Sequence, residues 1–195
     1  MRRTLLLLAT TALTLLVASG VASAATIHCP NNSSGGSPST ELFCFGTLMA
    51  DTMFGSDLND SMFGSYGKDT IHGYGGIDYV SGGNGSDHIY GDAGNDDTLW
   101  GGGYDFNTDT YTDNSDDYVH GGSGNDDITG GWAQGGVDRL YGEGGNDTID
   151  ASQRHNSFSP VTKEIIDCGG GASDEVFFDR NKDVVTNCEI KHGFS

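Results

Sequence analysis

The sequence repeats every nine residues over most of its length, and this period constrains the fold more than any other feature. From Gly46, five units follow without a gap: GTLMADTMF, GSDLNDSMF, GSYGKDTIH, GYGGIDYVS and GGNGSDHIY. Asp occupies the sixth position of each unit, and a large apolar residue occupies the eighth. After insertions the phase returns, most clearly in 121–129 and 142–150. A sustained short period predicts a repeat architecture in which each unit stacks on its neighbours.

The residue types within each unit predict a turn followed by a short strand. Glycine at the first, second and fourth positions permits positive φ, so the first six residues can turn sharply. The last three residues form a strand that points the eighth side chain inward. If two units complete one coil, each unit stacks on the unit two ahead, at about 4.8 Å. This packing brings Asp69 over Asp87, and Asp78 near Asp96.

The composition is strongly acidic. The chain has 195 residues, with 28 Asp or Glu against 9 Lys or Arg, for a net charge of −19. Nucleic acids and anionic membranes repel a polyanion, so neither is an expected partner. Stacked carboxylates also repel one another unless a cation lies between them. Calcium suits them, because it takes roughly 6–8 oxygen ligands and the carbonyl groups of Gly-rich turns can supply those that carboxylates do not.

This pattern resembles the RTX, or haemolysin-type, calcium-binding nonapeptide family, G-G-x-G-x-D-x-U-x, in which U is a large apolar residue. Units 82–90, 121–129 and 142–150 carry the resemblance most clearly, and it extends from residue 46 to about 186. It implies an all-β fold, a right-handed parallel β-roll (a β-solenoid) whose turns bind several calcium ions.

The repeat phase also gives the expected calcium ligands. Asp96 follows the loop register of its unit and Asp97 follows the strand register, so both are candidates. Met49 and Leu58 replace the fourth Gly in the first two units, so the aspartates of those units are left out. The predicted carboxylate ligands are Asp69, Asp78, Asp87, Asp96, Asp97, Asp117, Asp126, Asp138 and Asp147. The predicted turn glycines around the ions are Gly73, Gly76, Gly82, Gly83, Gly85, Gly91, Gly94, Gly121, Gly122, Gly124, Gly142 and Gly145.

Two insertions, at 103–116 and 151–163, interrupt the repeat. In the first, alternate oxygen-bearing residues follow the spacing of an EF-hand loop, which suits an additional calcium ion. Thr110 stands where such a loop needs Gly, so a solvated polar loop is the alternative. The second insertion is expected to be a lateral loop. The residues that would hold the additional ion are Asp105, Asn107, Asp109, Asp113 and Asp116.

The first 24 residues have the pattern of a secretory signal peptide. Arg2 and Arg3 precede an apolar run from Leu5 to Val17, and small residues at 22–24 supply a cleavage site. The run is shorter than the roughly 20 residues that a membrane-spanning helix needs. We therefore expect a secreted, extracellular protein without a membrane span. Its expected parts are an N-terminal cap (25–45), the repeat region (46–186) and a C-terminal cap or tail (187–195).

The four cysteines form two close pairs near the ends of the repeat region: Cys29 with Cys44, and Cys168 with Cys188. An even number of cysteines in an exported protein predicts disulfides, and three pairings are possible. Pairing within each close pair is the most economical, and it would close both ends of the roll. The spacings do not fit a zinc site.

The sequence contains no catalytic signature such as H-E-x-x-H, G-x-S-x-G or a phosphate loop. We therefore expect a protein that is not an enzyme: a monomeric, calcium-binding repeat protein that folds when calcium binds. Its expected role is structural or in surface interaction, with a glycan or protein outside the cell as the partner. A calcium-dependent glycan-binding module is one alternative, and a hydrolase with a site in the insertions is another.

Overall fold

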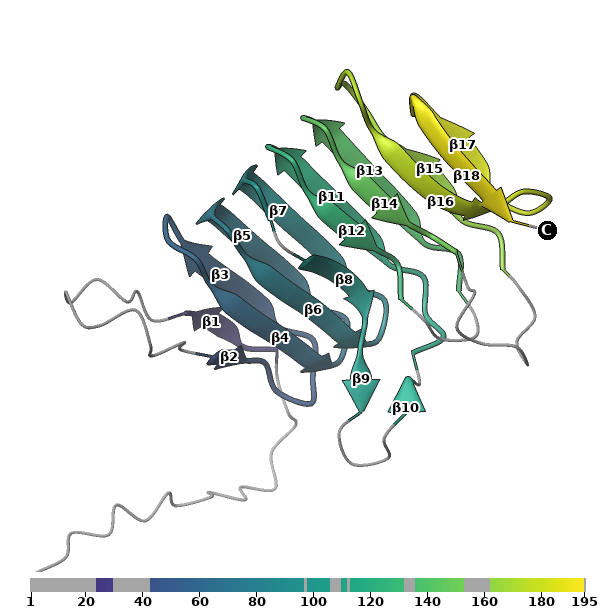
Figure 1. Ribbon diagram of the computed structural model, residues 1–195. Coiled ribbons are helices and arrows are strands. Elements are labelled where there is room, and N and C mark those ends of the chain that lie inside the picture. The colour runs from purple at the N-terminus through teal and green to yellow at the C-terminus, as the bar shows by residue number, and fades with distance from the viewer. Residues whose placement is uncertain are drawn as a thin grey trace, which may run out of the picture.

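The computed structural model describes residues 24–29, 43–96, 98–105, 110–111, 113–131, 136–152 and 162–194. These residues form two parallel sheets of eight strands each, and a small antiparallel hairpin projects from one side of them (Figure 1). Within these ranges there is no helix with the length and hydropathy that a membrane crossing requires. The predictions for the signal peptide (1–24) and for the lateral loop (151–163) fall mostly outside the described residues.

Successive strands alternate between the two sheets. One sheet has the order β1 (Thr26–His28), β3 (Thr52–Ser56), β5 (Thr70–Gly76), β7 (His88–Gly94), β11 (Tyr118–Ser123), β13 (Arg139–Gly144), β15 (Ile165–Asp167), β17 (Val184–Thr186). The other has the order β18 (Ile190–Phe194), β16 (Glu175–Asp179), β14 (Thr148–Asp150), β12 (Asp127–Thr129), β8 (Thr98–Gly102), β6 (Tyr79–Asn84), β4 (Ser61–Tyr66), β2 (Phe43–Phe45). The hairpin consists of β9 (Tyr104–Asp105) and β10 (Thr110–Tyr111).

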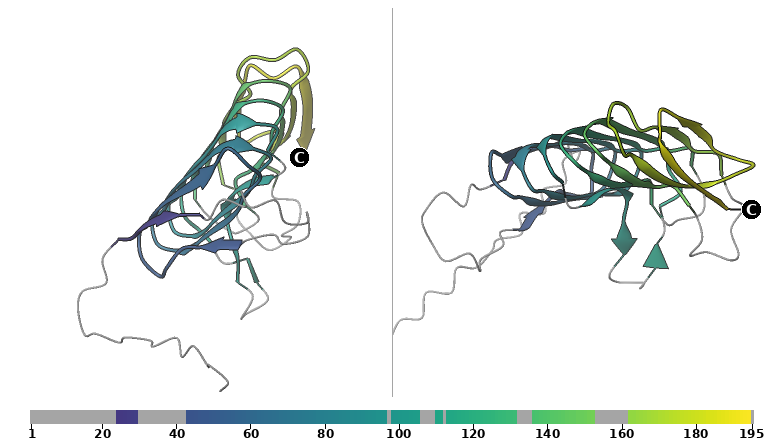
Figure 2. Two further views of the ribbon diagram at one scale, coloured as in Figure 1. Left: turned by 90° about the vertical axis from the view of Figure 1, so that its left-hand side faces the viewer. Right: turned by 45° about the horizontal axis from the view of Figure 1, so that its top comes forward.

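Each strand pairs in register with the strand one coil ahead. Thr52 pairs with Thr70, and Ile71 pairs with Ile89, so one coil contains two nonapeptides. Figure 2 shows the resulting flattened tube, with one sheet on each side and the turns at the two edges. The prediction of a parallel β-roll is confirmed.

The interior of the roll holds one apolar side chain from each repeat unit. These eighth-position side chains are completely buried: Met53, Met62, Ile71, Val80, Ile89, Leu99, Val119, Ile128, Leu140, Ile149, Ile166 and Val176. Because strand side chains alternate, the residues on either side of each of them face outward. The repeat phase therefore predicted the core correctly.

Outward-facing rings on the sheet of odd-numbered strands stack along the roll. We call this set the ring row; neighbouring ring centroids lie 4.6–5.7 Å apart. Two of its imidazoles also contact carboxylates: His72 Nδ1 lies 3.2 Å from Asp92 Oδ2, and His120 Nδ1 lies 2.8 Å from Glu143 Oε1. The members of the ring row are His28, Phe54, His72, Tyr90, His120 and Tyr141.

Both disulfides have the predicted pairing. Cys29, just after β1, is bonded to Cys44 in β2, so this bond joins the two sheets at the N-terminal end. Cys168 and Cys188 follow the paired strands β15 and β17, so their bond joins the last two coils. The Cα atoms lie 5.5 and 5.1 Å apart, within the usual range for disulfides.

The turns depend on backbone conformations that the repeat glycines permit. Fourth-position glycines from Gly67 to Gly145 have φ between +93° and +158°. At the second position, however, four residues other than glycine adopt positive φ, between +70° and +82°: Ser65, Tyr74, Asp92 and Glu143. The fourth position therefore needs glycine more strictly than the second, because successive coils approach most closely there.

Substitution of two adjacent glycines should separate this requirement from general effects of a Gly→Ala change. A Cβ on Gly145 would lie 1.5 Å from the carbonyl oxygen of Gly124, and the φ of Gly145 is +149°. A Cβ on Gly144 would have no neighbour closer than 3.7 Å. Gly145→Ala should lower the free energy of unfolding by about 2 kcal/mol or more, and Gly144→Ala should have little effect. Chemical denaturation in saturating calcium measures both, and equal losses would contradict this account.

Candidate metal centre

The sixth-position carboxylates are stacked in two ladders, one along each edge of the roll. The odd ladder precedes the odd-numbered strands, and the even ladder precedes the even-numbered strands. All but the last member of each ladder are at most 9 % exposed. The odd ladder consists of Asp51, Asp69, Asp87, Asp117, Asp138, Glu164 and Asp183. The even ladder consists of Asp60, Asp78, Asp96, Asp126, Asp147, Asp174 and Glu189.

Each rung of a ladder is a hydrogen bond between successive coils. The backbone N–H of Asp69 donates to Oδ1 of Asp87 at 2.8 Å, and the N–H of Asp78 donates to Oδ1 of Asp96 at 3.0 Å. Across both ladders these distances run from 2.5 to 3.1 Å. The predicted stacking of Asp69 on Asp87 and of Asp78 on Asp96 is confirmed, and the ladders show that one oxygen of each carboxylate already has a partner.

The second oxygen of most rungs has no donor among the described residues. A buried acceptor without a partner is costly, and a carboxylate without a counter-charge is more so. These oxygens are therefore the places where the ladders need a proton or a cation. They are the Oδ2 atoms of Asp69, Asp78, Asp87, Asp96, Asp117, Asp126, Asp147 and Asp174.

First-position glycines face these oxygens. A Cβ on Gly82 would lie 2.4 Å from both Asp87 Oδ2 and the carbonyl oxygen of Gly101. A Cβ on Gly64 would lie 2.5 Å from Asp69 Oδ2 and 2.3 Å from the carbonyl oxygen of Gly82. Each turn thus brings a carboxylate oxygen and a carbonyl oxygen of the next coil to a place that a side chain would fill.

The donor set fits a hard cation that takes oxygen ligands. Among the described residues no group of three or more His, Cys, Asp or Glu side chains is placed to hold a metal. An ion at the turns would therefore combine one or two carboxylates with backbone carbonyl groups. Calcium accepts such mixed oxygen sets readily, whereas zinc prefers nitrogen and sulfur ligands.

Burial in the ladders raises the pKa values of the carboxyl groups. It raises the pKa of Asp69, Asp78 and Asp147 to about 7, and that of Asp87 to about 8. The inter-coil N–H bonds act in the opposite direction, but desolvation is the larger effect. Burial followed by the nearby charge of Asp113 raises the pKa of Asp117 to about 11.

The structure brings most of the predicted ligands together. Of the predicted aspartates, all except Asp97, which lies outside the described residues, belong to the ladders. The loop register was therefore the correct one for that unit, because Asp96 is the rung. First-position glycines face the Oδ2 atoms: Gly73, Gly82, Gly91, Gly121 and Gly142. The other predicted glycines have positive φ in the turns: Gly76, Gly83, Gly85, Gly94, Gly122, Gly124 and Gly145.

The first insertion contacts the roll through the two acidic residues whose side chains are described. Asp113 Oδ1 accepts hydrogen bonds from the N–H groups of Gly85 and Ser115, both at 3.2 Å. Asp116 Oδ1 accepts one from Val137 at 2.8 Å. These bonds join the insertion to neighbouring turns. Asn107 and Asp109, and the side chain of Asp105, lie outside the described part of the chain, so the additional calcium site stays a prediction.

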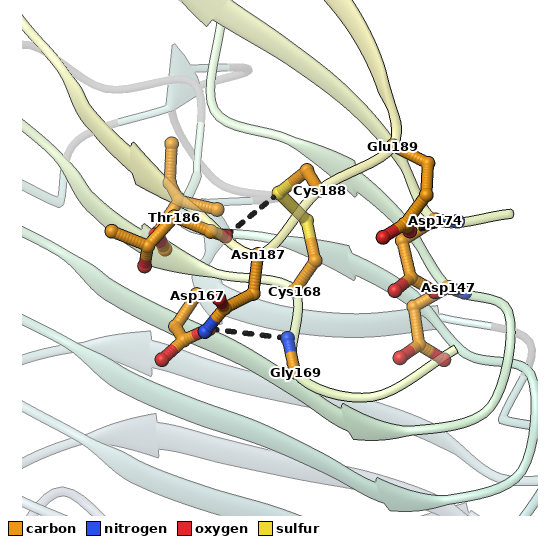
Figure 3. The surroundings of a disulfide bond; sticks show 10 residues. Asp147, Asp167, Cys168, Gly169, Asp174, Thr186, Asn187, Cys188 and Glu189 are labelled. Atoms are coloured by element: carbon orange, nitrogen blue, oxygen red, sulfur yellow. Dashed lines mark hydrogen bonds between the residues drawn. A yellow bond between two sulfur atoms is a disulfide. The ribbon is translucent and has the colours of Figure 1, made fainter. Parts of the chain in front are cut away.

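The predicted ligands left out the last rungs of both ladders, although the repeat phase reaches Asp174 and Asp183. Figure 3 shows Asp147, Asp174 and Glu189 one above another, beside the disulfide of Cys168 and Cys188. The N–H of Asp147 donates to Asp174 at 2.9 Å, and that of Asp174 donates to Glu189 at 3.1 Å. The phase of the inward-facing strand residues includes three of these rungs: Glu164, Asp174 and Asp183 lie two positions before Ile166, Val176 and Val185. Glu189 lies two positions before Lys191, which is exposed, so the buried residues give no signal for it. The missed members are Glu164, Asp174, Asp183 and Glu189.

The sequence of these turns also matches a sequence model of a known protein family. The model describes the RTX calcium-binding nonapeptide repeat in four copies, and it matches residues 45–80, 63–97, 72–106, 111–134 and 132–153. The chain belongs to this family. No curated protein and no solved structure has significant similarity to the chain. The matches cover more than half of this RTX-repeat protein and include the rungs from Asp51 to Asp147.

The raised pKa values predict how the calcium-free protein responds to pH. A folded-state pKa above the unfolded value means that the folded protein binds protons more tightly. Without calcium, this contribution to stability should be complete below about pH 4 and lost as the pH rises through about 6 to 8.

With saturating calcium the trend should reverse, because ions and protons compete for the same oxygens. Thermal unfolding followed by circular dichroism from pH 4 to 9, in saturating calcium and in buffer from which calcium has been removed, measures both slopes. If the calcium-free protein becomes more stable as the pH rises, the ladders do not control its pH dependence.

Proposed function

We propose that this RTX-repeat protein is an exported, calcium-stabilised structural protein, whose roll forms when calcium binds at its turns. The observation that supports this most directly is the row of buried carboxylate oxygens along both edges that have no donor among the described residues. The residues that would hold the ions are the ladder aspartates from Asp69 to Asp147, together with carbonyl groups of the first-position glycines. Bound calcium would supply the positive charge that these oxygens lack.

Calcium binding and folding are coupled in this proposal. The unfolded chain would keep its carboxylates apart in water, whereas the roll brings them into stacked, buried positions. Without a counter-charge, burial of these groups opposes folding, so the binding free energy of the ions becomes folding free energy. Extracellular calcium modules bind with dissociation constants of about 10⁻⁴–10⁻³ M, which would keep the chain unfolded before export and folded afterwards.

Export is supported by the two disulfides, since such bonds persist in oxidising compartments. RTX repeats are typically non-catalytic, and we propose no enzymatic activity for this chain. The proposed role is therefore to present a rigid, acidic surface outside the cell, as a monomer.

A calcium-dependent glycan-binding module is the second candidate. A surface groove of about 380 Å³ lies over Gly122, which has no side chain and pairs with Asp92 and Glu143 on the neighbouring strands. Tyr90, Asp92, His120 and Glu143 line this groove. Its carboxylates suit sugar hydroxyl groups. The rings, however, stack on each other with centroids 5.0 Å apart, so those faces cannot pack on a sugar ring. We therefore prefer the structural role; binding on a glycan array in calcium but not in EGTA would favour the alternative.

Removal of calcium and substitution of one rung test the proposal. In EGTA the full chain with intact disulfides should lose most of its β-sheet circular dichroism, and calcium should restore it. Asp87→Asn keeps an oxygen for the N–H of Asp69 but replaces Oδ2, which has no donor within the described ranges, with an NH₂ group. This change should raise the calcium concentration at half-folding by roughly ten-fold or more.

Asp57→Asn is the matched control, because Asp57 is exposed and outside both ladders, and it should leave the midpoint nearly unchanged. Calorimetric titration gives the number of ions in each variant. Equal β-sheet content with calcium and with EGTA would overturn the proposal.

A further inference from the structure

In the first two repeat units, protein groups donate hydrogen bonds to the second carboxylate oxygen, Oδ2, without an ion. Asp51 Oδ2 accepts hydrogen bonds from the Thr47 N–H at 2.6 Å and from the Thr47 hydroxyl at 2.8 Å. Its Oδ1 accepts one from the N–H of Ala25 at 2.9 Å. Asp60 Oδ2 is bonded in the same way, by the N–H of Ser56 at 2.7 Å and its hydroxyl at 3.0 Å.

The hydroxyl alone does not explain the difference from later units. Ser65 occupies the same second position in the third unit, yet Asp69 Oδ2 of that unit has no donor among the described residues. Ser65 has φ of +82°, whereas Ser56 is absent from the residues with positive φ in the described chain. The two serines therefore sit in turns of different shape.

The fourth position accounts for the two shapes. Gly67 in the third unit has φ of +129°, a conformation that a residue with a Cβ rarely adopts. In the first two units that position holds Met49 and Leu58, which avoid it. The turn then keeps the second residue in an ordinary conformation, with its N–H and hydroxyl directed at the carboxylate.

Other contacts hold this end of the roll together. The disulfide of Cys29 and Cys44 joins the first strands of the two sheets. Outside the roll, the rings of Phe43, Phe45 and Phe63 pack together, with centroids 5.2–6.3 Å apart. Two fully buried methionines, Met53 and Met62, fill the interior. The same end thus combines a covalent link, extra apolar packing and carboxylates with protein donors.

The C-terminal end is mixed. Glu164 accepts bonds at both oxygens, from the Asp138 N–H and from the Thr162 hydroxyl, and so does Asp183. Asp174, in the other ladder, still has an Oδ2 without a donor among the described residues. Among the described residues, both ladders therefore have protein donors to the second oxygen at the N-terminal end only.

We infer that the N-terminal end, from β1 to β4, is a calcium-independent cap that stays folded without calcium. This inference rests on the proposed function. Met49 and Leu58 determine the conformation of the turn. In that conformation Thr47 and Ser56 donate to the carboxylate oxygen that would otherwise need an ion. Each coil contacts only its neighbours, so such a cap can keep its structure while later coils are open.

Hydrogen exchange of the full chain, with its disulfides intact, tests the cap directly. In EGTA, amides of β3 and β4 should exchange roughly 100-fold or more slowly than those of β7 and β11. In calcium all four strands should be protected. Equal loss of protection in EGTA would overturn the cap and leave the proposed function standing. Full protection of β7 and β11 in EGTA would overturn the proposed function, and the cap with it.

A single substitution should convert the second unit into a calcium-dependent one. Leu58→Gly produces GSDGNDSMF, which has the glycine spacing of the third unit. In EGTA it should lower protection of β4 by roughly ten-fold, and calcium should restore it and add one ion to the stoichiometry. Leu58 is 44 % exposed, so the change removes little packing.

Leu48→Gly is the matched control, because it makes the same change at an exposed third position. Its loss of protection should be small and equal in EGTA and calcium. Ser56→Ala should lower protection of β4 in both conditions, since it removes a donor without creating a turn for an ion. If Leu58→Gly behaves like Leu48→Gly, with no calcium rescue and no added ion, then Leu58 does not determine whether the turn depends on calcium.

Discussion

The hydrogen bond from each ladder residue's N–H to the carboxylate one coil ahead holds the turns of this roll in register. A bond to a charged acceptor is stronger than a neutral one, and every coil makes two of them. The same bonds place a row of carboxylates in buried positions 2.5–3.1 Å from the backbone of the neighbouring coil. These bonds therefore fix the register of the coils, but they also bury carboxylate groups. The charge of each buried carboxylate must be neutralised at its second oxygen.

The thin interior makes this neutralisation decisive. Each unit buries one apolar side chain, so a coil gains less from hydrophobic burial than a thicker fold would. Outward ring stacking and the two disulfides add to it, but they do not touch the unpartnered oxygens. A proton or a cation at the turns is the remaining means of removing the charge, and the raised pKa values express the same requirement.

The period of the sequence was enough to predict which residues align but not which atoms pair. The stacking of Asp69 on Asp87 and the buried column follow from phase alone, whereas both disulfides were predicted from the closeness of the paired cysteines in the sequence. The inter-coil bond does not, because its donor is a backbone N–H that every unit has. The phase also could not show that Tyr74 and Glu143 would accept positive φ where the pattern has glycine. Glu164 could not be predicted from a column of aspartates, because it fills the same position with a different acidic residue.

The two repeat units that need no ion lie at the N-terminal end of the roll, and this location follows from the way in which stacked turns would share the ligands of an ion. A cation held between turns needs oxygens from a turn on each side, and a turn at the end of a roll has a repeat neighbour on one side only. The segment before Gly46 contains no nonapeptide, so the first turn on each edge lacks that neighbour. Protein donors from Thr47 and Ser56 are available within the unit itself. A residue that forbids the glycine turn, such as Met49 or Leu58, is therefore best placed in the first coil, where an ion site would be least complete.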